Sequence, residues 1–79
     1  MLAIQSRMAR AAIGWGVREL AAAAKVSPDT VARLERGDSL YPRTVEAIRA
    51  TLEAAGVEFI TENGGGVGVR LKKPGTDDS

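Results

Sequence analysis

Apolar positions recur with helical spacing through residues 2–55 and then alternate in short runs. In four stretches hydrophobic side chains return every three or four residues, which places them on one face of a helix. Glycine or proline separates these stretches, and both residues interrupt helices. The pattern predicts helices over residues 2–13, 17–24, 28–36 and 42–55, the last of them opening at Pro42 or Arg43.

The first predicted helix has one apolar face. Four side chains fall at i, i+4, i+7 and i+8 and are expected to face the core: Ile4, Met8, Ala11 and Ala12. Trp15 follows between two glycines that end the helix. A large aromatic in this setting is more typical of a packing anchor over the core than of a platform on which a nucleic-acid base stacks.

Residues 27–37 carry the start and stop signals of a short helix. Ser27 is a good N-cap, Pro28 suits the first helical position, and Asp29 interacts favourably with the helix dipole. Gly37 suits the position after the C-cap. Two faces result: an inward one with Val31 and Leu34, and an outward one with Asp29, Ala32, Arg33 and Arg36.

After residue 56 the pattern becomes typical of β-structure. Residues 57–60 and 67–71 are short β-prone runs, and the link between them contains the turn-forming pair Asn63-Gly64. These runs predict a hairpin, or two strands joined by a flexible link.

The expected fold is therefore mainly α, with a small C-terminal β element. Residues 1–56 form a four-helix unit and residues 57–72 the β element. Residues 73–79 are rich in polar residues, proline and glycine, and we expect a disordered tail there.

Composition argues against an enzyme. The 79 residues make one small domain with three aromatics, so the core is thin and a dimer interface would add stability. The chain has no cysteine and no histidine, which removes thiolate chemistry, disulfides and the commonest general base and metal ligand. The glycine-rich run 64–68 precedes no helix and fits no nucleotide motif. We predict no catalytic residues, no metal, no cofactor and no small-molecule ligand.

The net charge of +1 does not by itself indicate nucleic-acid binding. Its distribution says more, since residues 1–49 contain eight Lys and Arg against five Asp and Glu. The N-terminus has charges where a signal peptide needs an apolar run, and no segment is long enough to span a membrane. We expect a cytoplasmic protein without a membrane partner.

The segment from Val17 to Gly37 resembles the helix-turn-helix of Cro/C1-type regulators, also called Xre-type or phage-repressor-like. The residues that match in the family's spacing are Leu20-Ala21, Val26-Ser27, Val31, Leu34-Glu35 and Gly37. The likeness covers residues 4–56, including Arg10 and the Pro42-Arg43 opening of the fourth helix. It implies a four-helix phage-repressor-like domain whose helix 28–36 enters the major groove, which is wide enough for one α-helix.

Base contacts are expected from the outward face of that helix. Arg33 lies one turn into it, and arginine to guanine O6 and N7 is the commonest specific contact. Asp29 can accept from a cytosine or adenine amino group, or can simply sit on the helix dipole. Pro28 and Ala32 offer apolar contact to thymine methyls. For each residue alone, a solvated charged face is the alternative.

Phosphate contacts set the register of a protein on DNA rather than its sequence preference. The candidates are Arg18, Lys25, Arg36 and Arg43 as cations, Ser27 as a cap that also touches phosphate, and Thr30, which reaches a phosphate or a thymine methyl. Val17 departs from the family, which often has a polar, phosphate-binding residue there. That contact is lost, or passes to the backbone of Gly16 or to Arg18.

The resemblance also implies a structural ion pair between Arg10 and Glu35, joining the first and third helices. Lys25 is a second departure, because the family commonly has glycine at this turn position, often with a positive φ. A lysine there carries a modest strain, or the turn differs slightly.

A helix-turn-helix usually binds as a dimer to half-sites about one helical turn apart. Val67, Val69 and Leu71 alternate on one face and can add to a partner's sheet. Together with the fourth helix, the predicted homodimer interface comprises Val57, Phe59, Ile60, Val67, Val69 and Leu71. The alternative is a hairpin that only caps its own subunit.

We therefore expect a homodimeric transcriptional regulator that binds an inverted-repeat operator in double-stranded DNA. Repression by occluding a promoter is the default expectation, because the chain is too short for a sensor domain; an activator would use the same fold. Two alternatives stay open. One is an antitoxin-type regulator paired with a toxin. The other is an interaction module without sequence-specific DNA binding, which the near-neutral charge and Val17 favour slightly.

Overall fold

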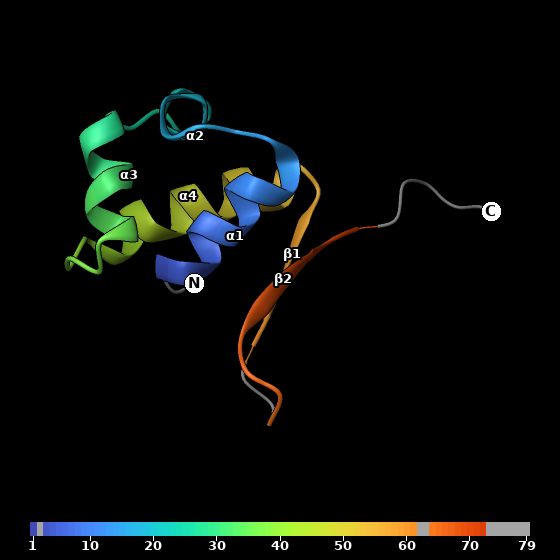
Figure 1. The fold of residues 1–79 in the computed structure, drawn as a ribbon. Coiled ribbons are helices and arrows are strands. Elements are labelled where there is room, and N and C mark those ends of the chain that lie inside the picture. The colour runs from blue at the N-terminus through green and yellow to red at the C-terminus, as the bar shows by residue number, and fades with distance from the viewer. Residues whose placement is uncertain (2, 62–63, 73–79) are drawn as a thin grey trace.

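The computed structural model describes residues 1, 3–61 and 64–72. Four helices are followed by an antiparallel hairpin (Figure 1): α1 Ala3–Ile13, α2 Val17–Ala24, α3 Pro28–Glu35, α4 Pro42–Ala54, β1 Val57–Ile60 and β2 Gly68–Leu71. The mainly α fold with a small C-terminal β element is confirmed. The predicted start of the first helix at Leu2, the Asn63 half of the predicted turn, and the predicted tail 73–79 lie outside the described residues.

The core lies where α2, α3 and α4 meet the start of the hairpin. Its largest fully buried apolar side chains are Leu20, Val31, Ile48, Leu52 and Val57. Ala9 and Ala21 are also buried, and their small side chains allow neighbouring helices to cross closely. Trp15 is half-buried and packs against this cluster, as the sequence predicts.

Three of the helices end in the same turn. In each, the N–H of the residue that leaves the helix donates to the carbonyl three residues back, and the next N–H donates to the carbonyl five residues back, which is a Schellman motif. The motif needs a positive φ, which Gly14 and Gly37 adopt without strain. In α2 the position belongs to Lys25, with φ 60° and ψ 41°. The strained turn suggested by the family resemblance is therefore present.

The two strands pair with each other within the chain. Val57 lies opposite Leu71 and Phe59 opposite Val69, and the N–H of Lys72 donates to the Gly56 carbonyl at 2.8 Å. Of the two arrangements left open by the sequence, the hairpin is present. Its second strand begins at Gly68, one residue later than predicted.

The predicted apolar face of α1 is wrong. Its buried side chains are Gln5, Ser6 and Ala9, whereas Ile4 is 48% exposed and Ala11 and Ala12 are exposed. Polar side chains are buried there because each is hydrogen-bonded. The Gln5 amide donates to the carbonyls of Ile60 and Gly68, both at 3.1 Å, and Ser6 binds Glu35. Met8, also predicted to face inward, is only half-buried.

Candidate nucleic-acid interface

The α2–turn–α3 unit presents one helix at the edge of the molecule. Figure 1 shows α3 on one side of the helical unit and the hairpin on the opposite side. The inward face of α3 is fixed by buried Val31 and Leu34, and α2 packs directly against it. The other face of α3 is free to meet a ligand.

The first turn of α3 is held by its cap. The Ser27 hydroxyl accepts from the Thr30 N–H at 3.1 Å, and the two hydroxyls lie 2.9 Å apart. Pro28 occupies the first helical position. The polar side chains of Ser27 and Thr30 thus organise the helix start, and their remaining hydrogen-bonding capacity faces the surface.

The outward stripe of α3 contains the predicted base-contacting residues. Pro28, Asp29 and Arg33 are exposed, as is Arg36 one turn beyond, and Ala32 is half-buried beneath them. Side chains four apart lie one above the other on a helix, so the row of Pro28, Ala32 and Arg36 and the row of Asp29 and Arg33 run side by side on this surface. Arg33 and Arg36 give it two cations.

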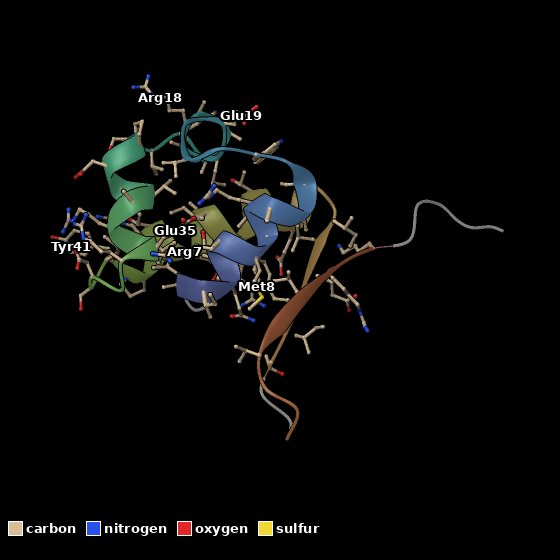
Figure 2. All side chains as sticks on the ribbon, in the orientation of Figure 1. Arg7, Met8, Arg18, Glu19, Glu35 and Tyr41 are labelled. Atoms are coloured by element: carbon tan, nitrogen blue, oxygen red, sulfur yellow. The ribbon has the colours of Figure 1, made fainter. Side chains whose placement is uncertain are left out.

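The predicted phosphate-contacting cations border this stripe or lie at neighbouring helix ends. Arg18, in the first turn of α2, extends away from the protein (Figure 2). Lys25 is exposed in the turn before α3, and Arg43 is exposed at the start of α4. The Arg43 guanidinium lies 5.9 Å from the centre of the Tyr41 ring, within the range of a cation–π contact.

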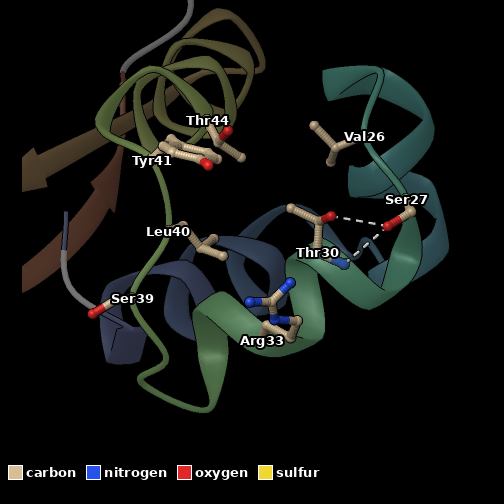
Figure 3. A pocket seen from close by; sticks show the side chains of 8 residues that line it. All are labelled: Val26, Ser27, Thr30, Arg33, Ser39, Leu40, Tyr41 and Thr44. Atoms are coloured by element: carbon tan, nitrogen blue, oxygen red, sulfur yellow. Dashed lines mark hydrogen bonds between the residues drawn. The ribbon is translucent and has the colours of Figure 1, made fainter.

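A groove of about 620 Å³ runs between α3 and the segment that leads into α4 (Figure 3). Its lining is Val26, Ser27, Thr30, Arg33, Ser39, Leu40, Tyr41 and Thr44. Hydroxyl groups and one guanidinium give it hydrogen-bond donors, and the lining contains no carboxylate. Sequence reasoning missed Ser39, Leu40, Tyr41 and Thr44. The available signal was Tyr41, an aromatic in a polar loop, which is 73% exposed.

The predicted Arg10–Glu35 ion pair is present and bidentate. Arg10 Nη2 donates to Glu35 Oε1 at 2.7 Å, and Arg10 Nε donates to Oε2 at 2.8 Å. Ser6 adds a hydrogen bond to the same carboxylate at 2.7 Å, and Arg7 donates to the Glu35 carbonyl at 2.9 Å. Figure 2 shows Glu35 pointing inward between α3 and α1. This network fixes the C-terminal end of α3.

The pKa of Glu35 reflects two opposing effects. Burial raises it, but the hydrogen bonds from Arg10 and Ser6 outweigh burial, so the pKa is lowered below the usual value of 4.5. The carboxylate is therefore ionised at neutral pH. The pKa of Arg10 is raised by its hydrogen bond to Glu35, so the pair keeps both charges.

Comparison with known protein families decides the class. Residues 2–59, most of the chain, match the family model described as a helix-turn-helix domain. The chain belongs to the helix-turn-helix domain family. Membership of this family indicates a DNA-binding regulator. A search of curated proteins finds no match.

Within residues 1, 3–61 and 64–72, no three Asp, Glu, His or Cys side chains cluster as a metal site would require. Among the helices of these same residues, none has the length and apolar character needed to cross a bilayer.

The six residues predicted at a dimer interface occupy different environments in the helix-turn-helix domain. Val57 is fully buried, and Phe59 and Val69 pack on the core of the same chain. Ile60 and Val67 are half-buried, and Leu71 is 53% exposed. The inner face of the hairpin thus packs on the core of the same chain, while Leu71 is exposed.

Lys25→Gly should separate stability from DNA binding. Glycine adopts a positive φ without the Cβ clash that lysine suffers, so we expect a stability gain of about 1 kcal/mol, measured by urea unfolding. The same change removes a candidate phosphate contact, so DNA affinity should fall. Lys25→Ala is the matched control, since it removes the charge and keeps a Cβ. Equal stability of both variants would contradict the strain argument.

Proposed function

We propose that this domain binds a specific inverted-repeat operator in double-stranded DNA as a homodimer and represses transcription by occluding a promoter. The observation that carries the proposal is the stripe on α3, where Arg33 and Arg36 lie exposed on a helix whose opposite face is anchored in the core. A rigidly supported helix with free side chains suits the major groove. The proposed action is binding, without catalysis.

Within the proposed complex, the stripe and the groove have different tasks. Arg33 would bind a guanine edge through both terminal nitrogens, with Asp29, Pro28 and Ala32 against neighbouring bases. The groove beside it offers hydroxyl donors, of the kind that commonly bind phosphate and sugar oxygens. A DNA strand along this groove would fix the depth and angle of α3 in the major groove.

The proposed dimer uses the hairpin. Each strand of this two-stranded sheet has one edge that pairs with no other strand of the described residues. Such edges accept a strand from another chain. Leu71 adds an exposed apolar side chain at this element. Because the hairpin lies opposite α3, pairing there would leave both recognition helices free. Two copies related by a two-fold axis would match an inverted repeat.

Selection from a random-sequence DNA pool tests the proposal. We expect enrichment of an inverted repeat whose half-sites are centred about 10 base pairs apart or a multiple of this. A single enriched half-site would remove the dimer from the proposal. Absence of any enriched sequence would favour the interaction-module alternative and direct the search to a protein partner.

Arg33→Ala should weaken binding to the selected operator by about 1–3 kcal/mol and relax the preference at one base pair of each half-site. The loss follows from removing a bidentate contact to guanine. Arg49→Ala is the matched control, because Arg49 is a partly exposed arginine of α4 that pairs with Glu53 and lies neither on α3 nor in the hairpin. An unchanged base preference in Arg33→Ala would contradict the assigned role.

A further inference from the structure

One carboxylate faces both arginines of the α3 stripe. Asp38 follows the glycine that ends α3, and its N–H donates to the Arg33 carbonyl at 3.0 Å. This bond is part of the turn, so the backbone of Asp38 is fixed relative to the helix. Its Oδ2 atom lies 2.8 Å from Arg36 Nη2 and 3.8 Å from Arg33 Nε.

The atoms used by the two arginines differ. Arg33 meets Asp38 through Nε, so both of its terminal nitrogens stay available, and Figure 3 shows the end of this side chain between Thr30 and Leu40 in the groove. The two terminal nitrogens are a pair able to bind guanine O6 and N7. Arg36 instead donates a short hydrogen bond to Asp38 from one of its terminal nitrogens, Nη2.

We propose that Asp38 is a specificity-determining residue of this domain, which orients Arg33 for base contact and withholds Arg36 from phosphates at non-specific sites. The inference rests on the proposed function. Asp38 is a positioning residue, because it acts through the two arginines.

The two effects of Asp38 favour specific over non-specific DNA. Non-specific binding is almost wholly electrostatic, so a carboxylate that pairs with a cation and repels phosphates weakens it on every sequence. Orientation of Arg33 raises DNA affinity only where a guanine lies in register with this side chain. There it reduces the rotamer freedom that Arg33 loses on binding. Asp38 therefore lowers the electrostatic affinity for every DNA sequence, and only at the operator does the oriented Arg33 compensate for this loss.

Asp38→Asn tests the proposal with two DNA duplexes, the operator obtained by selection and a shuffled duplex of the same composition. The amide keeps the size of the side chain and loses its charge. We expect binding to the shuffled duplex to strengthen about fivefold per dimer, since each exposed ion pair carries a small free energy. Binding to the operator should stay the same or weaken. The ratio of the two dissociation constants should fall about tenfold.

Two further variants assign the cause. Glu53 in α4 forms a comparable ion pair with Arg49, at 3.2 Å. Glu53→Gln removes the same charge as Asp38→Asn and should leave the ratio of the two dissociation constants unchanged. In an Arg36→Ala background, Asp38→Asn should strengthen non-specific binding less than it does in the parent protein. Arg36, one of the two cations that Asp38→Asn would release, is then already absent. Thermal unfolding of each variant checks that the fold is retained.

The outcomes separate this inference from the function on which it rests. If the parent protein distinguishes operator from shuffled DNA and Asp38→Asn keeps the ratio, the role of Asp38 is overturned and the function is kept. An equal loss of affinity for both duplexes also overturns it. If the parent protein selects no sequence, the proposed function fails, and the role of Asp38 fails with it.

Discussion

Arg10→Ala is expected to destabilise the domain by about 3 kcal/mol or more, because it leaves a buried carboxylate without its main partner. The Glu35 side chain is only 5% exposed, and two of its hydrogen bonds come from Arg10. For a domain of this size, such a loss lowers the melting temperature by roughly 12 °C or more. Thermal and urea unfolding followed by circular dichroism measure both quantities.

Arg70→Ala is the control for Arg10→Ala. The Arg70–Glu58 pair has a similar distance, 2.8 Å, but lies on the exposed surface of the hairpin, where solvent screens it. We expect little change in its unfolding curve. Equal effects of the two substitutions would show that burial of Glu35 contributes nothing.

The pH dependence of unfolding gives an independent check on Glu35. Its folded-state pKa is lowered, so between that pKa and the unfolded value near 4.5 the unfolded chain binds more protons. The contribution of Glu35 is therefore fully present above pH 4.5 and is lost as the pH falls through the lowered folded pKa. Glu35→Gln, which cannot ionise, should flatten the stability profile in this acid window. An unchanged acid slope would contradict the assignment.

The helix positions follow from local signals in the sequence, and the structure agrees with them. Ser27-Pro28 starts α3 and Gly37 ends it, because capping depends on residues within one turn. The family resemblance adds what local signals lack, namely the Arg10–Glu35 pair and the unusual turn at Lys25.

The face of α1 shows where periodicity fails. Hydrophobic spacing predicts that Ile4 and Met8 face the core, but the buried side has Gln5 and Ser6, whose partners are far away in the chain. A buried polar residue is stabilised by the group that it meets, and the sequence of one helix does not contain that group.

Helical spacing also predicts only part of the candidate interface. Helical spacing predicts that Arg33 and Arg36 share the outward surface of α3. It does not place Asp38 between them, nor Tyr41 and Thr44 across the groove from Thr30, because these contacts depend on the path of residues 37–42 after the helix. Loops take that path from tertiary packing rather than from a periodic pattern.

Salt should control DNA binding more strongly than any single substitution. Four candidate phosphate-binding cations per chain, namely Arg18, Lys25, Arg36 and Arg43, make eight in the proposed dimer. Release of counterions from eight phosphates gives a slope of about −7 for the logarithm of affinity against the logarithm of salt concentration. Affinity for the operator should then fall about 10⁴-fold between 50 and 200 mM salt.

The slope of this salt dependence also reports the assembly that binds. A single chain with the same four cations would give a slope of about −4 and a fall of roughly 10²-fold over the same range. Arg43→Ala should make the slope shallower by about 2 in the dimer, because it removes one phosphate contact from each chain. Fluorescence anisotropy of a labelled operator at several salt concentrations measures both slopes. A slope shallower than about −2 would mean that most of these cations do not meet phosphates, and α3 would then face a partner other than DNA.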